Sequence, residues 1–349
     1  MGFNAAGWFA GSGGGPLVHG AVDVAGPGPD DVVVEVAACG LCHTDLGFAQ
    51  GKVAPKHALP LVLGHEIVGT VVACGERATA WKGAQVLVPA VLPCGKCAYC
   101  QAGRGNACPQ QKMPGNDIHG GFASHVVVPS GPLVRVDGFK DAEFRALGVV
   151  ADAVSTAYQA VRRAGLTAND LAIVVGAGGV GAFTVQVAAA LGARVVALDV
   201  NEDRLKLSAA HGATRTVMAG DPKATRKQVL DMARQFDAPP LRHKIFECSG
   251  TTAGQELAWS LMGHGCTLVF VGYTIEKIQV RLSNLMAFDA TAHGTWGCPP
   301  EAYGPVLEMV KHGKIVLAPF IEEGPMAKVN DYLGAMANHT LQRRMVLIP

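Results

Sequence analysis

The sequence predicts an α/β protein of two domains, in which a domain of short β-strands precedes a domain built on a doubly wound parallel sheet. Two patterns support this prediction. The first half consists of short apolar runs separated by Gly, Pro and Asp, whereas from about residue 153 apolar strands alternate with helical segments. The length of 349 residues also suits two domains, because a single hydrophobic core rarely grows beyond roughly 250–300 residues.

The first half is predicted to be all-β. Its clearest strands are rich in Val, which suits a pleated and partly buried surface, and turn-forming residues separate them. They span residues 31–39 (DVVVEVAAC), 66–74 (EIVGTVVAC), 84–91 (AQVLVPAV) and 122–130 (FASHVVVPS).

The second half is predicted to contain βαβ units, because its apolar strands are separated by segments of helical length and composition. The expected strands cover residues 171–175, 194–198, 244–248 and 266–272, and the expected helices cover residues 180–191 and 201–210. Parallel strands connected by helices form a sheet that is covered on both faces.

Composition excludes several kinds of partner. A net charge of +1 provides no basic field for nucleic acid or an anionic membrane, and no apolar segment reaches the roughly 18–20 uncharged residues of a membrane span. The N-terminus lacks a basic region followed by an apolar run, so we expect no signal peptide and a cytoplasmic location. The ten cysteines are then expected to remain reduced.

Four of these cysteines form a cluster within residues 93–109. Their spacing is C-x2-C-x2-C followed by seven residues and a fourth cysteine, namely Cys94, Cys97, Cys100 and Cys108. Four thiolates can surround one zinc ion tetrahedrally and leave no open position, which indicates a structural site. Thiolates at this spacing also hold iron–sulfur clusters, which is the alternative interpretation.

A glycine-rich loop follows the strand predicted at residues 171–175. The sequence GAGGVG places Gly176, Gly178 and Gly181 between that strand and a helix, with Gly179 and Val180 inside the motif. Such a loop allows the pyrophosphate of a dinucleotide to approach the N-terminus of the helix.

The cofactor preference depends on an acidic residue at the end of the next strand. Asp199 stands about twenty residues beyond the glycine-rich loop, where a carboxylate can accept hydrogen bonds from the adenosine ribose. The same charge repels a 2′-phosphate, so the sequence predicts NAD rather than NADP as the cofactor.

A second group of metal-binding residue types occurs in the first half. GLCHTDLG contains Cys42 and LGHE contains His65, both of which are zinc-ligand types. A catalytic zinc ion commonly has three protein ligands and one open position for water or substrate. Taken alone this pair is weak evidence of a metal site, but it occurs beside a four-cysteine cluster and a dinucleotide motif.

Together these segments resemble the zinc-containing medium-chain alcohol dehydrogenase family. The resemblance rests on CGLCHTD, GHEIVGTV, the four-cysteine cluster, GAGGVG with Asp199, and RRMVLIP near the C-terminus. It implies a chaperonin-10-like β-barrel catalytic domain formed by residues 1–153 and 290–349, and a Rossmann domain formed by residues 154–289. It also implies two zinc ions per chain, one held by the four cysteines and one by Cys42 and His65.

The resemblance assigns roles to five further residues. Thr44 would contact the substrate oxygen and receive its proton, and Asp45 would orient the histidine ligand. Glu66 matches a glutamate beside the catalytic zinc that can approach the metal. His43 would contact the cofactor pyrophosphate, and Arg204 would border the adenosine ribose.

The sequence departs from the family pattern at two positions. Asp152, in ADAVSTAYQA, occupies the place where many members carry a cysteine as the third zinc ligand. Carboxylates also bind zinc, so we expect Cys42, His65 and Asp152 as the ligand set. The alternative is that Asp152 caps the helix expected from about Val154, in which case Glu66 is the next candidate ligand. Gly47 replaces a histidine that ends the proton relay in many relatives, so the relay beyond Thr44 is open.

These features imply an NAD-dependent dehydrogenase of small-molecule alcohols. The segments CGLCHTDLGF, IHGGFASHVVVPS and WGCPPEAYGPVLEMV are most similar to the 6-hydroxycyclohex-1-ene-1-carbonyl-CoA dehydrogenases of anaerobic benzoyl-CoA degradation, which implies an acyl-CoA thioester substrate. One alternative is a dehydrogenase of simple primary, aromatic or polyol alcohols, and another is a non-enzymatic dinucleotide sensor. The resemblance also implies a homotetramer or homodimer, with the apolar segment 266–273 as a plausible sheet edge.

Overall fold

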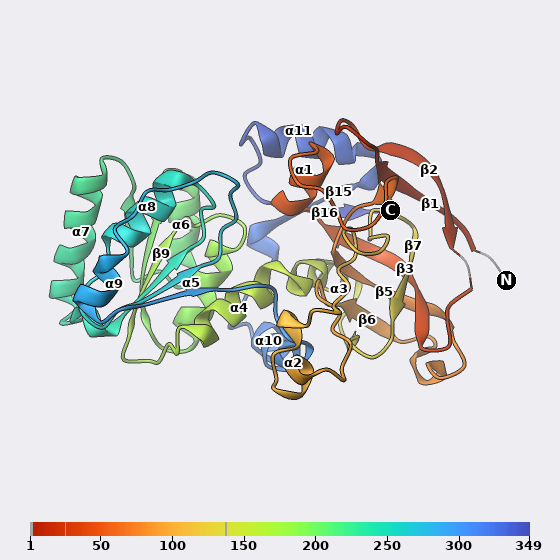
Figure 1. The fold of residues 1–349 in the computed structure, drawn as a ribbon, viewed down its shortest axis with the longest axis horizontal. Coiled ribbons are helices and arrows are strands. Elements are labelled where there is room, and N and C mark those ends of the chain that lie inside the picture. The colour runs from red at the N-terminus through yellow and green to blue at the C-terminus, as the bar shows by residue number, and fades with distance from the viewer. Residues whose placement is uncertain (1–2, 25, 137) are drawn as a thin grey trace. The chain divides into compact units, whose positions relative to one another are not determined.

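The computed structural model describes residues 3–24, 26–136 and 138–349 and divides the chain into two compact units (Figure 1). Unit 1 comprises residues 1–152, 297–307 and 320–349, and unit 2 comprises residues 153–296 and 308–319. The helix α10 (Tyr303–Lys311) contains one of the crossings between the two units.

Unit 1 is built on two sheets. The larger has seven strands in the order β15-β16-β3-β5-β6-β8, with β7 paired to β3, and the smaller has the order β2-β1-β4. Figure 1 shows β16, the last strand of the chain, beside the early strand β3. The strands of the larger sheet are β3 (Asp31–Gly40), β5 (Glu66–Cys74), β6 (Gln85–Val88), β7 (His125–Pro129), β8 (Val134–Arg135), β15 (Ile321–Pro325) and β16 (Arg344–Ile348). Those of the smaller are β1 (Phe3–Ala10), β2 (Val18–Val24) and β4 (Leu61–Val62).

Each of the four strands predicted in the first half is present, as β3, β5, β6 and β7. Strand β3 lies in the middle of its sheet and pairs antiparallel with β5, β7 and β16. Its residues Val32, Val33 and Val34 are fully buried, which explains why this strand has a continuous apolar run rather than an alternating pattern. Besides the first part of α10, the described part of unit 1 contains the helices α1 (His43–Ala49), α2 (Ala98–Gln101), α3 (Asp141–Ala146) and α11 (Val329–Ala337).

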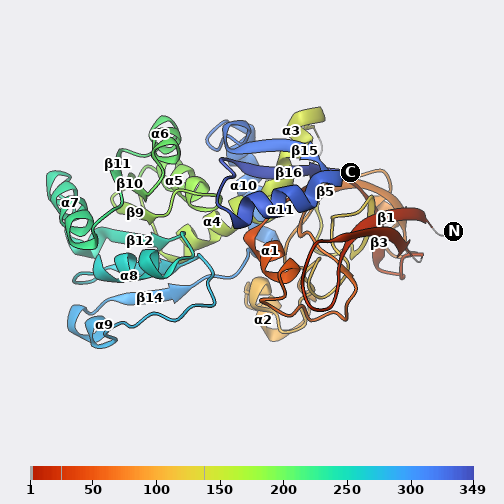
Figure 2. The same cartoon turned by 90° about the horizontal axis from the view of Figure 1, so that it is seen from above.

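Unit 2 contains a six-stranded parallel sheet in the order β11-β10-β9-β12-β13-β14, of which all strands except β13 are labelled in Figure 2. Strands β10 and β11 follow β9 on one side, and β12, β13 and β14 follow on its other side. The strand order therefore reverses between β9 and β12. The strands are β9 (Leu171–Val175), β10 (Arg194–Asp199), β11 (Arg215–Met218), β12 (His243–Glu247), β13 (Thr267–Phe270) and β14 (Thr291–Gly294). The helices are α4 (Ala153–Arg163), α5 (Gly181–Ala190), α6 (Glu202–Ala210), α7 (Pro222–Gln235), α8 (Thr252–Ser260) and α9 (Ser283–Phe288).

The strand predicted at residues 171–175 coincides with β9, and all five of its residues are buried between its neighbours β10 and β12. Helix α6 begins where the sequence predicts, because the Asn201 side chain accepts hydrogen bonds from the backbone N–H groups of Asp203 and Arg204. This confirms the expected doubly wound α/β sheet.

Two expectations about the end of this sheet are corrected. Strand β13, within the apolar segment 266–273, pairs with β12 on one side and β14 on the other, so it is not an edge. The edge strand is β14, whose sequence TAHG lacks a long apolar run. Because β14 belongs to this sheet, residues 291–294 lie in unit 2, whereas the boundary expected from the sequence precedes residue 290.

Within the described parts of the chain, none of the helices combines the length and the hydropathy that a bilayer-crossing segment requires.

Candidate active site

The N-terminus of α1 and the loop before β5 are held together by one buried carboxylate, that of Asp45. Asp45 Oδ2 accepts a hydrogen bond from the backbone N–H of Cys42 at 2.9 Å, and Oδ1 accepts one from the backbone N–H of Gly64 at 3.1 Å. Cys42 is the N-cap residue of α1, so this contact also fixes the start of the helix. Two segments that are separate in sequence are therefore joined beside Cys42 and His65.

His65 lies between two carboxylates. Its Nδ1 is 3.2 Å from Asp45 Oδ1, and its Nε2 is 3.6 Å from Asp152 Oδ2. The thiol of Cys42 is 3.8 Å from the same Asp152 oxygen. Asp152 directly precedes α4 in the chain, and its carboxylate faces Cys42 and His65.

The donor set of this group fits a zinc ion. One potential ligand atom from each of four residues, Cys42, His65, Glu66 and Asp152, lies within 4.8 Å of the others. Thiolate, imidazole and carboxylate are the usual zinc ligands, and the Asp45–His65 contact is the carboxylate–histidine pairing that orients a metal-bound imidazole. Although burial lowers the pKa of His65, the negative charge of Asp45 and the contact with Asp152 raise it well above its usual range. The site thus strongly favours a positive charge at this position.

Glu66 is bound by an arginine that the sequence reasoning missed. The Arg344 guanidinium forms a bidentate ion pair with the Glu66 carboxylate. Its Nε is 2.9 Å from Oε2, and its Nη2 contacts Oε1. Burial raises the pKa of the Glu66 carboxyl to about 7, although Arg344 opposes this rise. The available signal was the arginine pair at the start of the C-terminal segment RRMVLIP, but nothing in the spacing connected it with Glu66.

The remaining predicted residues of α1 lie at its first turn. The hydroxyl oxygen of Thr44 is 3.7 Å from the Cys42 sulfur, so Thr44 belongs to the same group of side chains. His43, the first residue of α1, is exposed. A Cβ added at Gly47 would contact only Val53 among the surrounding atoms, so packing does not require glycine there.

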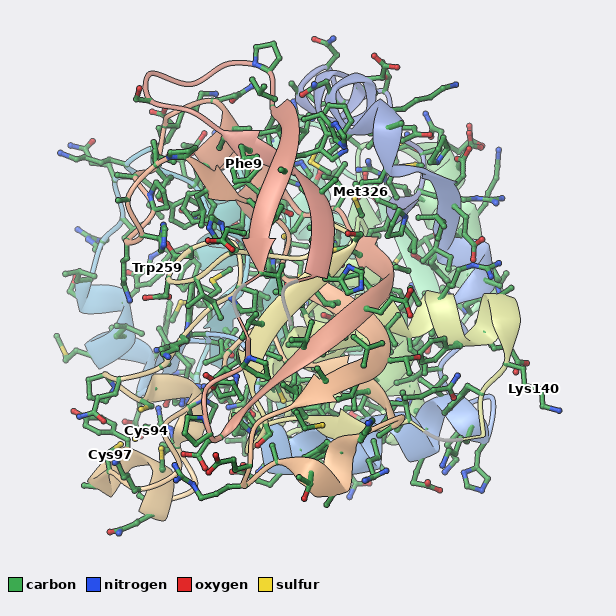
Figure 3. The ribbon with its side chains drawn as sticks, turned by 90° about the vertical axis from the view of Figure 1, so that its right-hand side faces the viewer. Phe9, Cys94, Cys97, Lys140, Trp259 and Met326 are labelled. Carbon is green, nitrogen blue, oxygen red and sulfur yellow. The ribbon has the colours of Figure 1, made fainter. Side chains whose placement is uncertain are left out.

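The four-cysteine cluster is a separate site in unit 1. The sulfurs are 3.5–4.0 Å apart in the pairs Cys94–Cys100, Cys97–Cys100, Cys97–Cys108 and Cys94–Cys108. Four sulfurs bound tetrahedrally at about 2.3 Å from one ion are separated by about 3.8 Å, so this arrangement fits a closed zinc site. Figure 3 shows that Cys94 and Cys97 lie close together.

Backbone hydrogen bonds around the cluster favour the thiolate form of Cys94 and Cys97. Hydrogen bonding from the backbone N–H of Lys96 lowers the pKa of Cys94 to about 6, whereas burial and the neighbouring thiols raise the pKa of Cys100 to about 12. Four adjacent thiolates repel one another unless a cation lies among them, which again fits a metal ion.

In unit 2 the glycine-rich loop connects β9 and α5. Gly176 has φ = +89°, and a Cβ there would lie 2.7 Å from the Ser249 backbone, so only glycine fits. A Cβ on Gly181 would lie 1.7 Å from the carbonyl oxygen of Gly176. Gly178 faces Arg204, and Gly179 and Val180 lead into α5, which begins at Gly181. The loop therefore has the glycines that close approach of a pyrophosphate requires.

Asp199 ends β10 beside this loop and is almost fully buried. Its Oδ2 accepts a hydrogen bond from Ala177 N at 2.7 Å, and Oδ1 accepts one from Asn201 N at 2.9 Å. Arg204 Nη1 is 3.9 Å from Oδ1. Asp199 thus secures the glycine-rich loop, a role that the sequence reasoning did not include.

Comparison with known proteins identifies the family. The alcohol dehydrogenase GroES-like domain matches residues 28–138, and the zinc-binding dehydrogenase domain matches residues 179–312. L-galactonate-5-dehydrogenase of Escherichia coli is 31% identical over 83% of this chain and 82% of its own length. The chain belongs to the zinc-binding alcohol dehydrogenase family.

Solved alcohol dehydrogenase structures share the whole fold. The alcohol dehydrogenase of the archaeon Aeropyrum pernix superimposes with a TM-score of 0.89 at 28% identity, covering 99% of this chain and 100% of that one. The acetophenone reductase of Geotrichum candidum, solved with NAD, has a TM-score of 0.86 at 26% identity, covering 99% and 97%.

As a member of the zinc-binding alcohol dehydrogenase family, the protein is an oxidoreductase of CH–OH groups that uses zinc and NAD. This confirms the enzyme class and cofactors expected from the sequence. The more specific resemblance to the hydroxyacyl-CoA dehydrogenases is not among these findings.

Proposed function

We propose that the protein catalyses reversible hydride transfer between NAD and an alcohol whose oxygen binds at the Cys42–His65–Asp152 group. The observation that carries this proposal is the convergence of three zinc-ligand types on one position, with Asp152 Oδ2 at 3.6 Å from His65 Nε2 and 3.8 Å from Cys42 Sγ. These three residues would hold the catalytic zinc, and the four cysteines would hold a second, structural zinc.

When bound, zinc would supply Lewis acidity that lowers the pKa of the substrate alcohol, and NAD would supply the hydride acceptor. The chain positions these groups and handles the proton. The Thr44 hydroxyl, beside the Cys42 sulfur, would accept the proton of the substrate hydroxyl. Asp45 would hold the His65 ring in place through the contact at Nδ1, leaving Nε2 directed at the metal position. Glu66 would stay paired with Arg344, which leaves Asp152 as the third ligand.

In unit 2 the glycine-rich loop at residues 176–181 would bind the pyrophosphate of NAD, and Asp199 and Arg204 would border the adenosine ribose. Asp199 has two hydrogen-bond donors in the protein already, but a carboxylate has lone pairs for further donors. His43 would contact the pyrophosphate from α1.

For the substrate we propose 6-hydroxycyclohex-1-ene-1-carbonyl-CoA, oxidised to the 6-oxo compound in aromatic hydrocarbon catabolism. The support is the resemblance of three sequence segments, CGLCHTDLGF, IHGGFASHVVVPS and WGCPPEAYGPVLEMV. The second candidate is a simple, aromatic or polyol alcohol, which is favoured by relatives that act on L-galactonate and acetophenone.

A substrate panel separates these candidates. NADH formation would be followed at equal concentrations of the cyclic hydroxyacyl-CoA, 1-phenylethanol, benzyl alcohol, L-galactonate and a short-chain alcohol. A preference of at least tenfold in kcat/KM for the CoA thioester supports the first candidate. A preference of the same size for L-galactonate or any other alcohol of the panel rejects it in favour of the second.

We further propose that the enzyme is a cytoplasmic homodimer or homotetramer that associates through unit 2. The support is an exposed sheet edge at β14 and large exposed apolar side chains in the chain segment around it: Tyr273, Ile275, Leu282, Met286 and Trp296. The two thiol-containing groups agree with a reducing compartment. Light scattering of the wild type and of Met286→Glu tests the assembly, because Met286 is 79% exposed and the change should weaken only association.

A further inference from the structure

A buried carboxyl group lies at the carboxyl end of β12, outside the residues assigned above. Glu247 is the last residue of β12, which lies beside β9 in Figure 2, and it pairs with Val175 of β9 and Phe270 of β13. Its side chain has no exposed surface. Val175 immediately precedes the glycine-rich loop, so Glu247 lies level with the strand end from which that loop begins.

Glu247 holds two loops at once. Its Oε1 accepts hydrogen bonds from Ser249 N at 2.8 Å, Ser249 Oγ at 2.5 Å and Gly250 N at 3.2 Å. Its backbone oxygen accepts hydrogen bonds from Val271 N at 2.8 Å and Gly272 N at 2.9 Å. The carboxylate therefore fixes the loop after β12, whereas the backbone of the same residue holds the loop after β13.

These loops and the glycine-rich loop pack backbone against backbone. A Cβ on Gly176 would lie 2.7 Å from Ser249 N, and one on Gly272 would lie 2.3 Å from Gly250 N. Besides these backbone atoms, Ser249 Cβ would lie 2.8 Å from the Cβ on Gly176. A small shift of residues 249–250 is therefore transmitted directly to Gly176.

The second oxygen of the Glu247 carboxyl group, Oε2, takes no part in the hydrogen bonds to Ser249 and Gly250. Among the described residues Glu247 Oε2 has no hydrogen-bond partner, and it would lie 2.8 Å from a Cβ on Gly272. Burial raises the pKa of Glu247, and its hydrogen bonds to Ser249 and Gly250 oppose the rise. A buried polar atom without a partner destabilises the fold, so stability of the sheet alone does not explain a glutamate at this position.

We propose that Glu247 is a positioning residue of the cofactor site, whose carboxylate holds the loop 248–251, and through it the adjoining loop 271–273, so that both flank the nicotinamide half of NAD. The assignment to that half follows from the strand order. Asp199 on β10 marks the adenosine side, and ligands of doubly wound sheets lie across the carboxyl ends at the point where the order reverses. The loops after β12 and β13 are on the opposite side of β9 from Asp199. This inference rests on the proposed NAD site.

The test compares the binding of NAD and AMP to the zinc-loaded, full-length protein by calorimetry. AMP contains only the adenosine half, so it reports on the Asp199 side. Glu247→Ala should raise the Kd for NAD about 10- to 100-fold, the loss expected when buried donors lose their acceptor, while changing the Kd for AMP less than twofold. His243→Gln is the matched control, because His243 is buried at the other end of β12. It should change neither Kd.

Two further variants keep the inference testable if Glu247→Ala does not fold. Glu247→Gln retains an acceptor at Oε1 and should bind NAD within about threefold of the wild type, whereas Glu247→Asp is too short and should lose affinity as the alanine variant does. The inference is overturned if Glu247→Ala binds NAD like the wild type, if NAD and AMP weaken equally, or if Glu247→Gln is as poor as Glu247→Ala. If the wild type binds neither NAD nor AMP, the proposed cofactor site fails instead.

Discussion

Arg344 and Glu66, which are 278 residues apart in the chain, form a buried ion pair in which Arg344 Nε is 2.9 Å from Glu66 Oε2. The side chains are 6% and 0% exposed. The pair joins the last strand of unit 1 to the segment that carries His65, and it occupies both oxygens of Glu66.

Replacing Arg344 should destabilise unit 1, because Glu66 would then be a buried charge without its partner. We expect Arg344→Gln to lower the free energy of unfolding by about 3–5 kcal/mol in a urea titration. The neighbouring Arg343 is exposed, so Arg343→Gln should leave the value unchanged within about 0.5 kcal/mol. The double variant Arg344→Gln/Glu66→Gln should recover part of the loss. Equal effects of the Arg343 and Arg344 variants would contradict this account.

Removal of Asp152 should selectively empty the catalytic zinc site. Asp152→Ala is expected to retain one zinc per chain instead of two, to bind NAD normally and to lose turnover, whereas Asp152→Cys should keep both ions with altered rates. Zinc content by mass spectrometry and NAD binding by calorimetry provide the measurements. If Asp152→Ala kept two zinc ions and normal turnover, Asp152 would be only a helix cap. Glu66 would then be the candidate for the third zinc ligand.

The four-cysteine cluster should affect stability rather than chemistry. Cys97→Ser is expected to lose one zinc ion and to lower the unfolding temperature, because binding of a structural metal is coupled to folding. Cys74 lies outside both metal groups, so Cys74→Ser is the matched control and should keep two zinc ions. A Cys97→Ser protein with unchanged unfolding temperature but reduced turnover would refute the structural role.

The preference for NAD over NADP should depend on Asp199. The structure adds a second expected effect, on the affinity for NAD, because Asp199 also holds the glycine-rich loop. Asp199→Ser removes both the charge that opposes a 2′-phosphate and the hydrogen bond to Ala177 N. We therefore expect the NAD to NADP preference to decrease and NAD affinity to fall by at least about tenfold. Asp203→Ser, on the exposed first turn of α6, should change neither value. Wild-type turnover with NADP equal to that with NAD would disprove the role of Asp199.

Local patterns were sufficient for the elements and for the ligand types. The apolar run 171–175 between turn residues predicts β9, and the spacing of Cys94, Cys97, Cys100 and Cys108 predicts four sulfurs around one ion. Both signals lie within a few residues of sequence. The fold then brings together Cys42, His65 and Asp152, but only the family resemblance had indicated that Asp152 lies near the other two.

Contacts between distant segments were not predictable in this way. No local sequence feature of Arg344 indicates its contact with Glu66. From the sequence alone, Glu247 is only a polar residue at the end of a strand, and its hydrogen bonds to the two loops appear only in the structure. Strand β14 was missed because TAHG has little β-forming character, so tertiary pairing with β13 determines its conformation. In each case the cause is the packing of the fold rather than the local sequence.

The division of unit 1 along the chain has a consequence for biosynthesis. Strands β3 and β5 are translated early, but the two strands that complete their sheet, β15 and β16, are translated after the whole of unit 2. The strands of the parallel sheet in unit 2 are therefore all synthesised while the first 152 residues still await their last partners. Until Arg344 has been synthesised, Glu66 lacks its arginine partner, so we expect nascent chains in this interval to be the form that most depends on chaperones.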